Sequence, residues 1–162
     1  MSGTPVSDIA SDQPAEITDE AILARFQNAK NPPPSATTLG FRMVAVCQEK
    51  MTVEVEFDAK YDLLGNPMKQ IQGGFVTAML DEVMSVACMV ASKMTSVAPT
   101  LEMKTSFFRP AMPGALRGVG RVAKWGRTIA FTEGELYDGE GRLLAKATGT
   151  AMPTPFSNYK KG

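Results

Sequence analysis

The stretch "GFVTAMLDEVMSVACMVASKM", residues 74–94, decides the fold of this chain. It contains no proline, and apolar or small residues occupy nearly every side of the helix that it would form. A helix that is apolar all round is usually buried in the middle of a fold, so other elements must surround it. Two carboxylates, Asp81 and Glu82, interrupt this apolar surface and require an explanation.

The segments on both sides of this helix predict strands. Residues 51–59, "MTVEVEFDA", alternate strictly between apolar and polar side chains, which is typical of a half-buried strand. The preceding stretch at 41–47, "FRMVAVC", is the expected hairpin partner, with its turn at 48–50. Four more strand-like stretches follow the helix, at residues 100–109, 115–125, 128–138 and 142–152.

We expect one domain, residues 17–156, between an N-terminal tail at 1–16 and a C-terminal tail at 157–162. Its first element would be a short helix over 18–29, with Thr18 as N-cap, which a run of prolines then ends. An antiparallel sheet of about six strands that curls around one long buried helix is the α+β hotdog fold. The chain shows no signal-peptide pattern, so a cytoplasmic location is expected.

The composition argues against several kinds of function. The chain has 17 basic and 17 acidic residues among its 162, so no net charge draws it to nucleic acid or to a membrane. It has no histidine and only two cysteines, Cys47 and Cys88, which leaves too few ligands for a zinc site. We therefore expect no metal and no other cofactor. Residues 103–132 carry six bases and no acid, a pattern typical of either solvated surface or a face for an anionic ligand.

One side of the predicted helix is small and polar. At 3.6 residues per turn, one stripe holds Gly73, Thr77, Asp81, Ser85 and Cys88. An ionised carboxylate that is buried without a partner costs several kcal/mol. Asp81 is therefore either paired with a base, on a face that meets water or another subunit, or it is functional.

A glycine pair, Gly73 and Gly74, begins this helix. Glycine allows a ligand to approach the backbone closely, and free N–H groups at a helix start suit a developing oxyanion. The same pair could simply permit a tight junction between loop and helix.

Three stretches together carry a resemblance to a known family. They are "GNPMKQIQGGFVTAMLDEVMSVAC", "PTLEMKTSFFRPAMPG" and "VAKWGRTIAFTEGELYDGEGRLLAKATGTAMP". Over roughly residues 40–153 the chain resembles the hotdog acyl-CoA thioesterases of the phenylacetate-degradation (PaaI-like) family. The resemblance implies hydrolysis of an acyl-CoA substrate by a homodimer or homotetramer, with the site formed between two subunits.

The resemblance also implies roles for individual residues. Asp81 matches the catalytic carboxylate, which acts as nucleophile or as the base that activates water. Gly73 matches the backbone N–H that polarises the thioester carbonyl, and Asn66 matches an amide near the attacking water or that carbonyl. Thr100 matches a hydroxyl that orients the nucleophile. Asp81 and Thr100 of one subunit would face Gly73 and Asn66 of the other.

Further residues would bind the substrate. Gly74 would allow close approach of the thioester, and Arg109, Lys124 and Arg127 are candidates for contacts with the phosphates of coenzyme A. The chain departs from the family at Gln72, where the family commonly has histidine before the glycine pair. Glutamine donates and accepts hydrogen bonds but does not titrate near neutrality.

The absence of histidine separates the candidate reactions. Hotdog hydratases and dehydratases pair a histidine with an acid, and a Ser-His-Asp hydrolase also needs one. A carboxylate beside an oxyanion hole needs no imidazole, so thioester hydrolysis fits best. The alternative is a non-catalytic acyl-CoA-binding or sensing hotdog protein. The presence of Asp81, and the lack of a DNA-binding extension in the pattern of residues 1–30, favour the enzyme.

Overall fold

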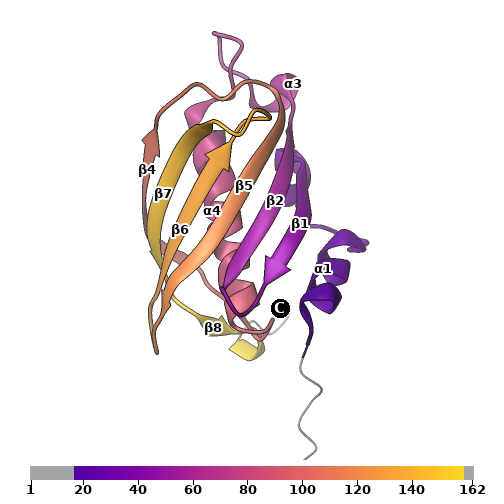
Figure 1. Ribbon diagram of the computed structural model, residues 1–162, viewed down its shortest axis with the longest axis vertical. Coiled ribbons are helices and arrows are strands. Elements are labelled where there is room, and N and C mark those ends of the chain that lie inside the picture. The colour runs from indigo at the N-terminus through magenta and orange to yellow at the C-terminus, as the bar shows by residue number, and fades with distance from the viewer. Residues whose placement is uncertain (1–16, 159–162) are drawn as a thin grey trace, which may run out of the picture.

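The computed structural model describes residues 17–158 and has the predicted α+β architecture (Figure 1). The helices are α1 (Asp19–Gln27), α2 (Pro34–Leu39), α3 (Tyr61–Leu64) and α4 (Gly73–Ala91), and a 3-10 turn follows at Phe156–Asn158. The strands are β1 (Phe41–Cys47), β2 (Thr52–Ala59), β3 (Ser96–Val97), β4 (Thr100–Phe107), β5 (Gly114–Trp125), β6 (Ala130–Tyr137), β7 (Leu143–Ala151) and β8 (Thr154–Pro155). The predicted tail at 1–16 and most of the one at 157–162 lie outside the described residues.

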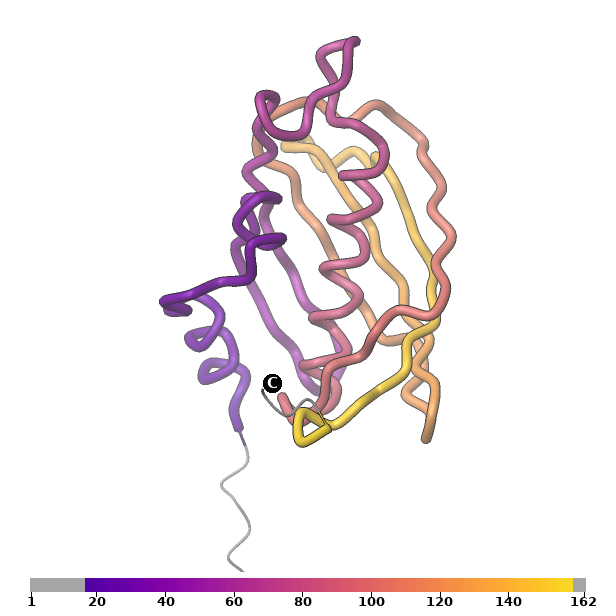
Figure 2. Tube along the Cα trace, turned by 180° about the vertical axis from the view of Figure 1, so that it is seen from behind, coloured from indigo at the N-terminus to yellow at the C-terminus, as the bar shows by residue number. Residues whose placement is uncertain are grey.

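Six strands form one antiparallel sheet in the order β1-β2-β5-β6-β7-β4, which confirms the predicted hotdog sheet. The short strands β3 and β8 pair separately. Strand β4 is an edge strand, with β7 on one side and no strand of the described chain on the other. Figure 2 shows α4 lying across the sheet, with β4 along one flank and the α1–α2 segment along the other.

Helix α4 packs closely on the sheet because glycines replace side chains where it crosses the strands. The alternating residues Val53, Val55 and Phe57 of β2 are buried, as the period-two pattern predicts. At Gly120 of β5, an added Cβ would lie 2.1 Å from the carbonyl oxygen of Val83, so the helix backbone rests directly on the strand. The glycines therefore fix how deep α4 sits in the curved sheet.

The proline-rich segment differs from the prediction. The first helix does end at Gln27, but a second helix, α2, begins at Pro34 inside the proline run. Proline suits the first position of a helix, since its missing N–H has no intrahelical acceptor there and its φ is already helical. Gly40 then ends α2 in the left-handed conformation, with φ of 69°.

Helix α4 is long and apolar enough to cross a membrane by length and composition alone. Its Leu80, Val83 and Val90 side chains are fully buried. They pack within a core shared with the strands, which is the position of a core helix in a soluble protein.

Candidate active site

The carboxylate of Asp81 is held by a hydroxyl from the edge strand. Thr100, the first residue of β4, donates from Oγ1 to Oδ1 of Asp81 at 2.6 Å. Among residues 17–158, no lysine or arginine pairs with Asp81, and its Oδ2 atom has no hydrogen-bond donor. The interpretation that a base neutralises Asp81 is therefore wrong for the chain as described. The carboxylate is oriented through one oxygen and keeps the other available.

The stripe predicted on α4 is largely confirmed. Gly73, Thr77, Asp81 and Ser85 are all partly exposed on the side of the helix that the sheet does not cover. Cys88, which was expected on the same stripe, is fully buried instead. Burial raises the pKa of the Cys88 thiol to about 12, so this sulfur stays protonated and unreactive at neutral pH.

Gln72 is the N-cap of α4, a role that the sequence reasoning missed. Its Oε1 atom accepts hydrogen bonds from the N–H groups of Gly74 at 2.6 Å and Phe75 at 3.3 Å. The expectation that the Gly74 amide is available to a ligand is therefore wrong. The Gly73 N–H, by contrast, has no acceptor among residues 17–158. A glutamine directly before the first helical residue, followed by two small residues, was the signal for this cap.

Asn66 shapes the loop before the glycine pair. Its Oδ1 atom accepts from the N–H groups of Met68 at 2.9 Å and Gln70 at 3.0 Å, which folds the loop into a tight turn. The side-chain carbonyl is therefore occupied, and the Nδ2 amide is the part of Asn66 that remains for a ligand. This loop leads through Ile71, whose N–H donates to the carbonyl of Ala111, to the start of α4.

One cavity, of about 330 Å³, brings three of the predicted site residues together. Asn66, Gly73 and Arg109 line it beside Phe107 and Phe108 at the end of β4. Arg109 donates from one guanidinium nitrogen to the carbonyl of Leu143 at 2.8 Å, which holds its side chain at the sheet edge. The structure therefore joins Asn66, Gly73 and Arg109, but neither Asp81 nor Thr100 lines this cavity.

Lys124 and Arg127 lie at the other end of the sheet. One row of partners runs across the strands through Trp125, Ala130, Ala151 and Thr100, so the β5–β6 turn shares its end with Thr100. The opposite end of β4 is Phe107, whose ring lies near Gly73. Two half-sites thus stand at the two ends of β4, with bases near each.

Other bases in the segment 103–132 have structural partners. Arg117 pairs with Glu54 at 2.9 Å and its guanidinium stacks over the ring of Tyr137, while Arg121 pairs with Glu133. The apparent excess of bases in the sequence is therefore partly neutralised by acids from neighbouring strands. Arg109, Lys124 and Arg127 form no ion pair within the described residues.

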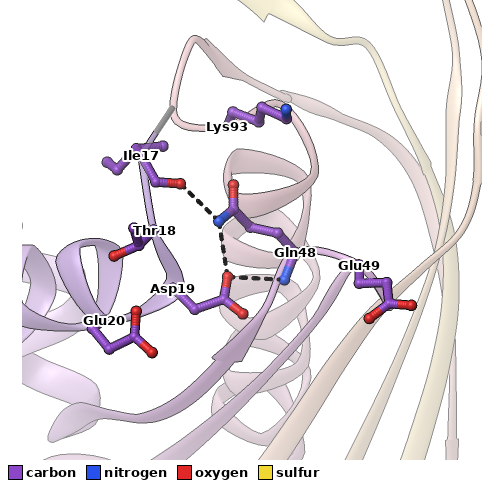
Figure 3. Close-up of a pocket in the computed structure, with 7 residues that line it drawn as sticks. All are labelled: Ile17, Thr18, Asp19, Glu20, Gln48, Glu49 and Lys93. Carbon is purple, nitrogen blue, oxygen red and sulfur yellow. Dashed lines mark hydrogen bonds between the residues drawn. The ribbon is translucent and has the colours of Figure 1, made fainter. Parts of the chain in front are cut away.

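An open hollow of about 520 Å³ near the start of α1 has a structural role (Figure 3). There the Gln48 side chain donates to the Ile17 carbonyl and to Asp19 Oδ1, both at 2.9 Å. The Gln48 backbone N–H also donates to Asp19. These bonds tie α1 to the β1–β2 turn, and none of the predicted site residues lines the hollow.

Solved structures of thioesterases share this fold. A phenylacetic acid degradation-related protein from Ralstonia eutropha JMP134 superposes with a TM-score of 0.72 at 37% identity, covering 80% of this chain and 98% of that one. A protein from Streptococcus mutans UA159, solved with acetyl CoA bound, superposes with a TM-score of 0.61 at 24% identity, covering 71% of this chain and 89% of that one. The second likeness concerns the fold alone.

Sequence comparison gives the same class. The description "Thioesterase superfamily" matches residues 70–145, which include the glycine pair, Asp81 and Thr100. A protein from Thermoplasma volcanium that is named as an esterase is 34% identical over 79 residues, which span 49% of this chain and 59% of that relative. The chain belongs to the thioesterase superfamily, and its predicted likeness to the PaaI-like proteins is confirmed.

Proposed function

We propose that the chain hydrolyses an acyl-CoA thioester to a free acid and coenzyme A. The observation that carries this proposal is the Asp81 carboxylate, oriented by Thr100 and free of any described base, in a chain that also offers an unbonded Gly73 N–H. A fold neighbour that holds acetyl CoA supports the choice of CoA thioesters over other esters.

The chemistry needs both groups at one thioester. The free oxygen of Asp81 activates a water molecule or itself attacks the carbonyl carbon, and the Gly73 N–H stabilises the negative charge on the carbonyl oxygen. The carbon–sulfur bond then breaks, and the CoA thiolate leaves and takes up a proton. Where Asp81 attacks directly, water afterwards hydrolyses the acyl-aspartyl intermediate.

The two groups of one chain are too far apart to act on the same carbonyl. Gly73 and Asp81 are eight positions apart on α4, which places them about 12 Å apart along the helix axis at a rise of 1.5 Å per residue. An oxyanion donor and an attacking oxygen both need to lie within about 3 Å of the reacting group. A second copy of the chain must therefore supply one of the two.

Strand β4 offers the surface for that second copy. It is an open edge on which Leu101 and Phe107 each leave 54% of their surface exposed, an arrangement that monomeric proteins usually avoid. Antiparallel pairing of two β4 strands about a two-fold axis brings Thr100 of each copy opposite Phe107 of the other. The Thr100–Asp81 pair of one copy then lies near the Gly73 of the other, so a homodimer, alone or within a homotetramer, completes the site.

The same pairing gathers the candidate bases. Arg109 stands beside Gly73, and Lys124 and Arg127 stand at the Thr100 end, so two copies would bring these bases to one site. Arginine and lysine donors suit the phosphates of coenzyme A. We propose a cytoplasmic location, where acyl-CoA substrates occur.

The test measures thiol release from a panel of short, medium, long and aryl acyl-CoAs. Asp81→Asn should lower kcat by roughly 10²–10⁴-fold because it removes the catalytic carboxylate. Thr100→Val should lower it by about 10-fold or more, since a hydrogen bond to a charged group is lost, while Thr100→Ser keeps the hydroxyl. Unchanged turnover in Asp81→Asn would contradict the assignment. Tight binding of acyl-CoA without thiol release would instead support the non-catalytic alternative.

A further inference from the structure

A second cavity, of about 540 Å³, lies on the other flank of α4. It is enclosed between α4 and the α1–α2 segment, and apolar side chains dominate its wall, with the rings of Phe26 and Phe41 opposite Val86 and Met89. Its volume is within the range of pockets that hold small organic ligands. None of the residues assigned above to catalysis or to phosphate binding lines it.

Glu82 brings a carboxylate into this apolar cavity. It forms no hydrogen bond or ion pair with any residue between 17 and 158. Burial, and to a smaller extent the neighbouring charge of Asp81, raise the pKa of Glu82. The second carboxylate of the cavity, Asp58, is exposed and lies 3.7 Å from Lys60. A carboxyl group placed among apolar side chains without a partner needs a reason, because such groups are normally hydrogen-bonded.

Glu82 is also the direct neighbour of Asp81. Consecutive residues of a helix differ by about 100° around its axis and 1.5 Å along it. Asp81 therefore points toward β4, where Thr100 holds it, and Glu82 points toward the α1–α2 segment. Figure 2 shows that the side of α4 between these two flanks is not covered by the sheet. A substrate lying across this side reaches both carboxylates.

We propose that the cavity receives the acyl part of the substrate, and that Glu82 selects acyl groups that carry a hydroxyl group at the end away from the thioester. This inference rests on the thioesterase function proposed above. With the thioester carbonyl at Asp81, the acyl group extends over α4 into the apolar cavity. There the substrate hydroxyl gives Glu82 the hydrogen bond that the folded chain lacks. A wholly apolar acyl group leaves the carboxyl group desolvated and unpaired, which weakens its binding.

The experiment compares matched substrates that differ by one hydroxyl group: 6-hydroxyhexanoyl-CoA with hexanoyl-CoA, and 4-hydroxybenzoyl-CoA with benzoyl-CoA. The measured quantity is the ratio of kcat/KM within each pair. For at least one pair the unmodified chain should favour the hydroxylated member by about 10-fold or more, and Glu82→Leu should remove or reverse that preference. Glu49→Leu, which removes an exposed carboxylate on the β1–β2 turn, should leave the ratios unchanged.

A second measurement separates selection from catalysis. Dissociation constants for the same pairs are measured by calorimetry in Asp81→Asn, and in Asp81→Asn combined with Glu82→Leu. The preference should be present in the first protein and lost in the second. Equal ratios with and without Glu82 would overturn the role of Glu82 while leaving hydrolysis intact. Failure of the unmodified chain to hydrolyse any member would refute the proposed function, whereas the binding ratios would still report on the cavity.

Discussion

The Gln72 side chain caps the helix that carries Asp81, because its Oε1 atom accepts from the amides of Gly74 and Phe75. This position is where the chain departs from the family's common histidine. Its observed contacts are structural ones that glutamine makes without titrating. They leave the Gly73 N–H as the first unbonded amide of α4, pointing out of the helix start. The departure at Gln72 is therefore compatible with the proposed oxyanion hole.

Loss of this cap should destabilise the fold. Gln72→Ala should lower the free energy of unfolding by about 1 kcal/mol, because two amides at the start of α4 lose their acceptor. Gln72→Ser, which offers a shorter cap, should lose less. Urea unfolding followed by circular dichroism measures both. Equal losses in the two variants would show that the cap is not the cause.

The raised pKa of Glu82 predicts a pH-dependent effect on stability. Its ordinary value is 4.5, and burial moves it upward in the folded chain, so the folded state binds this proton more tightly than the unfolded state. The charged side chain therefore disfavours folding once the pH rises above that ordinary value. Glu82→Gln should be more stable than the unmodified chain at neutral pH, and its advantage should shrink as the pH falls below 4.5. Urea titrations across this range would count against the explanation if the advantage were independent of pH.

At the scale of elements, the position of α4 depends on small residues in the strands beneath it. Gly120 lies under the carbonyl of Val83, and Gly118 lies under the Val83 side chain and the ring of Phe57. A methyl group at Gly120 would have to push the helix backbone away from the sheet, since the contact is with backbone atoms that cannot rotate aside.

Gly120→Ala should therefore destabilise the chain by about 1–3 kcal/mol or more. Gly139, in the β6–β7 turn, is the matched control, because an added Cβ there meets nothing within 4 Å. Gly139→Ala should stay within about 0.5 kcal/mol of the unmodified chain. Thermal unfolding of both variants measures the difference, and a neutral Gly120→Ala would refute close helix–sheet contact.

Elements with a regular pattern could be predicted from the sequence. The alternation in 51–59 gave β2 and its buried face, and the apolar run gave α4 to within three residues at its end. Helix α2 was missed because the prolines that end one helix also suit the first turn of another. The bond between Asp81 and Thr100 joins residues 19 positions apart, so no local pattern contains it. Only the resemblance to a family placed both residues in one site.

For the whole molecule, the central claim is that two copies of the chain build each site. One chain holds the Thr100–Asp81 pair at one end of β4 and Gly73 near the other end. Antiparallel pairing of the open edges converts this separation into proximity, and it also covers the exposed Leu101 and Phe107 side chains. A dimer is thus required by the chemistry and favoured by the surface.

Gly73 allows a precise removal of one half of the site. It is the first residue of α4, and Gln72 before it is extended with φ of −66° and ψ of 139°, a conformation that suits a residue before proline. Gly73→Pro therefore deletes the N–H at a position where proline is well tolerated. It should lower kcat by about 10²–10³-fold, whereas Gly73→Ala, whose Cβ would approach Phe107 no closer than 3.6 Å, keeps the N–H and the activity.

Recovery of activity by two inactive chains tests the account most directly. Asp81→Asn and Gly73→Pro chains are each assayed alone, then mixed after reversible unfolding so that mixed dimers form. Each mixed dimer should contain one intact site, and equal random mixing should restore about a quarter of the unmodified thiol release. Mixed dimers, verified by distinct affinity tags, that release no more thiol than the separate variants would contradict a site shared between two chains.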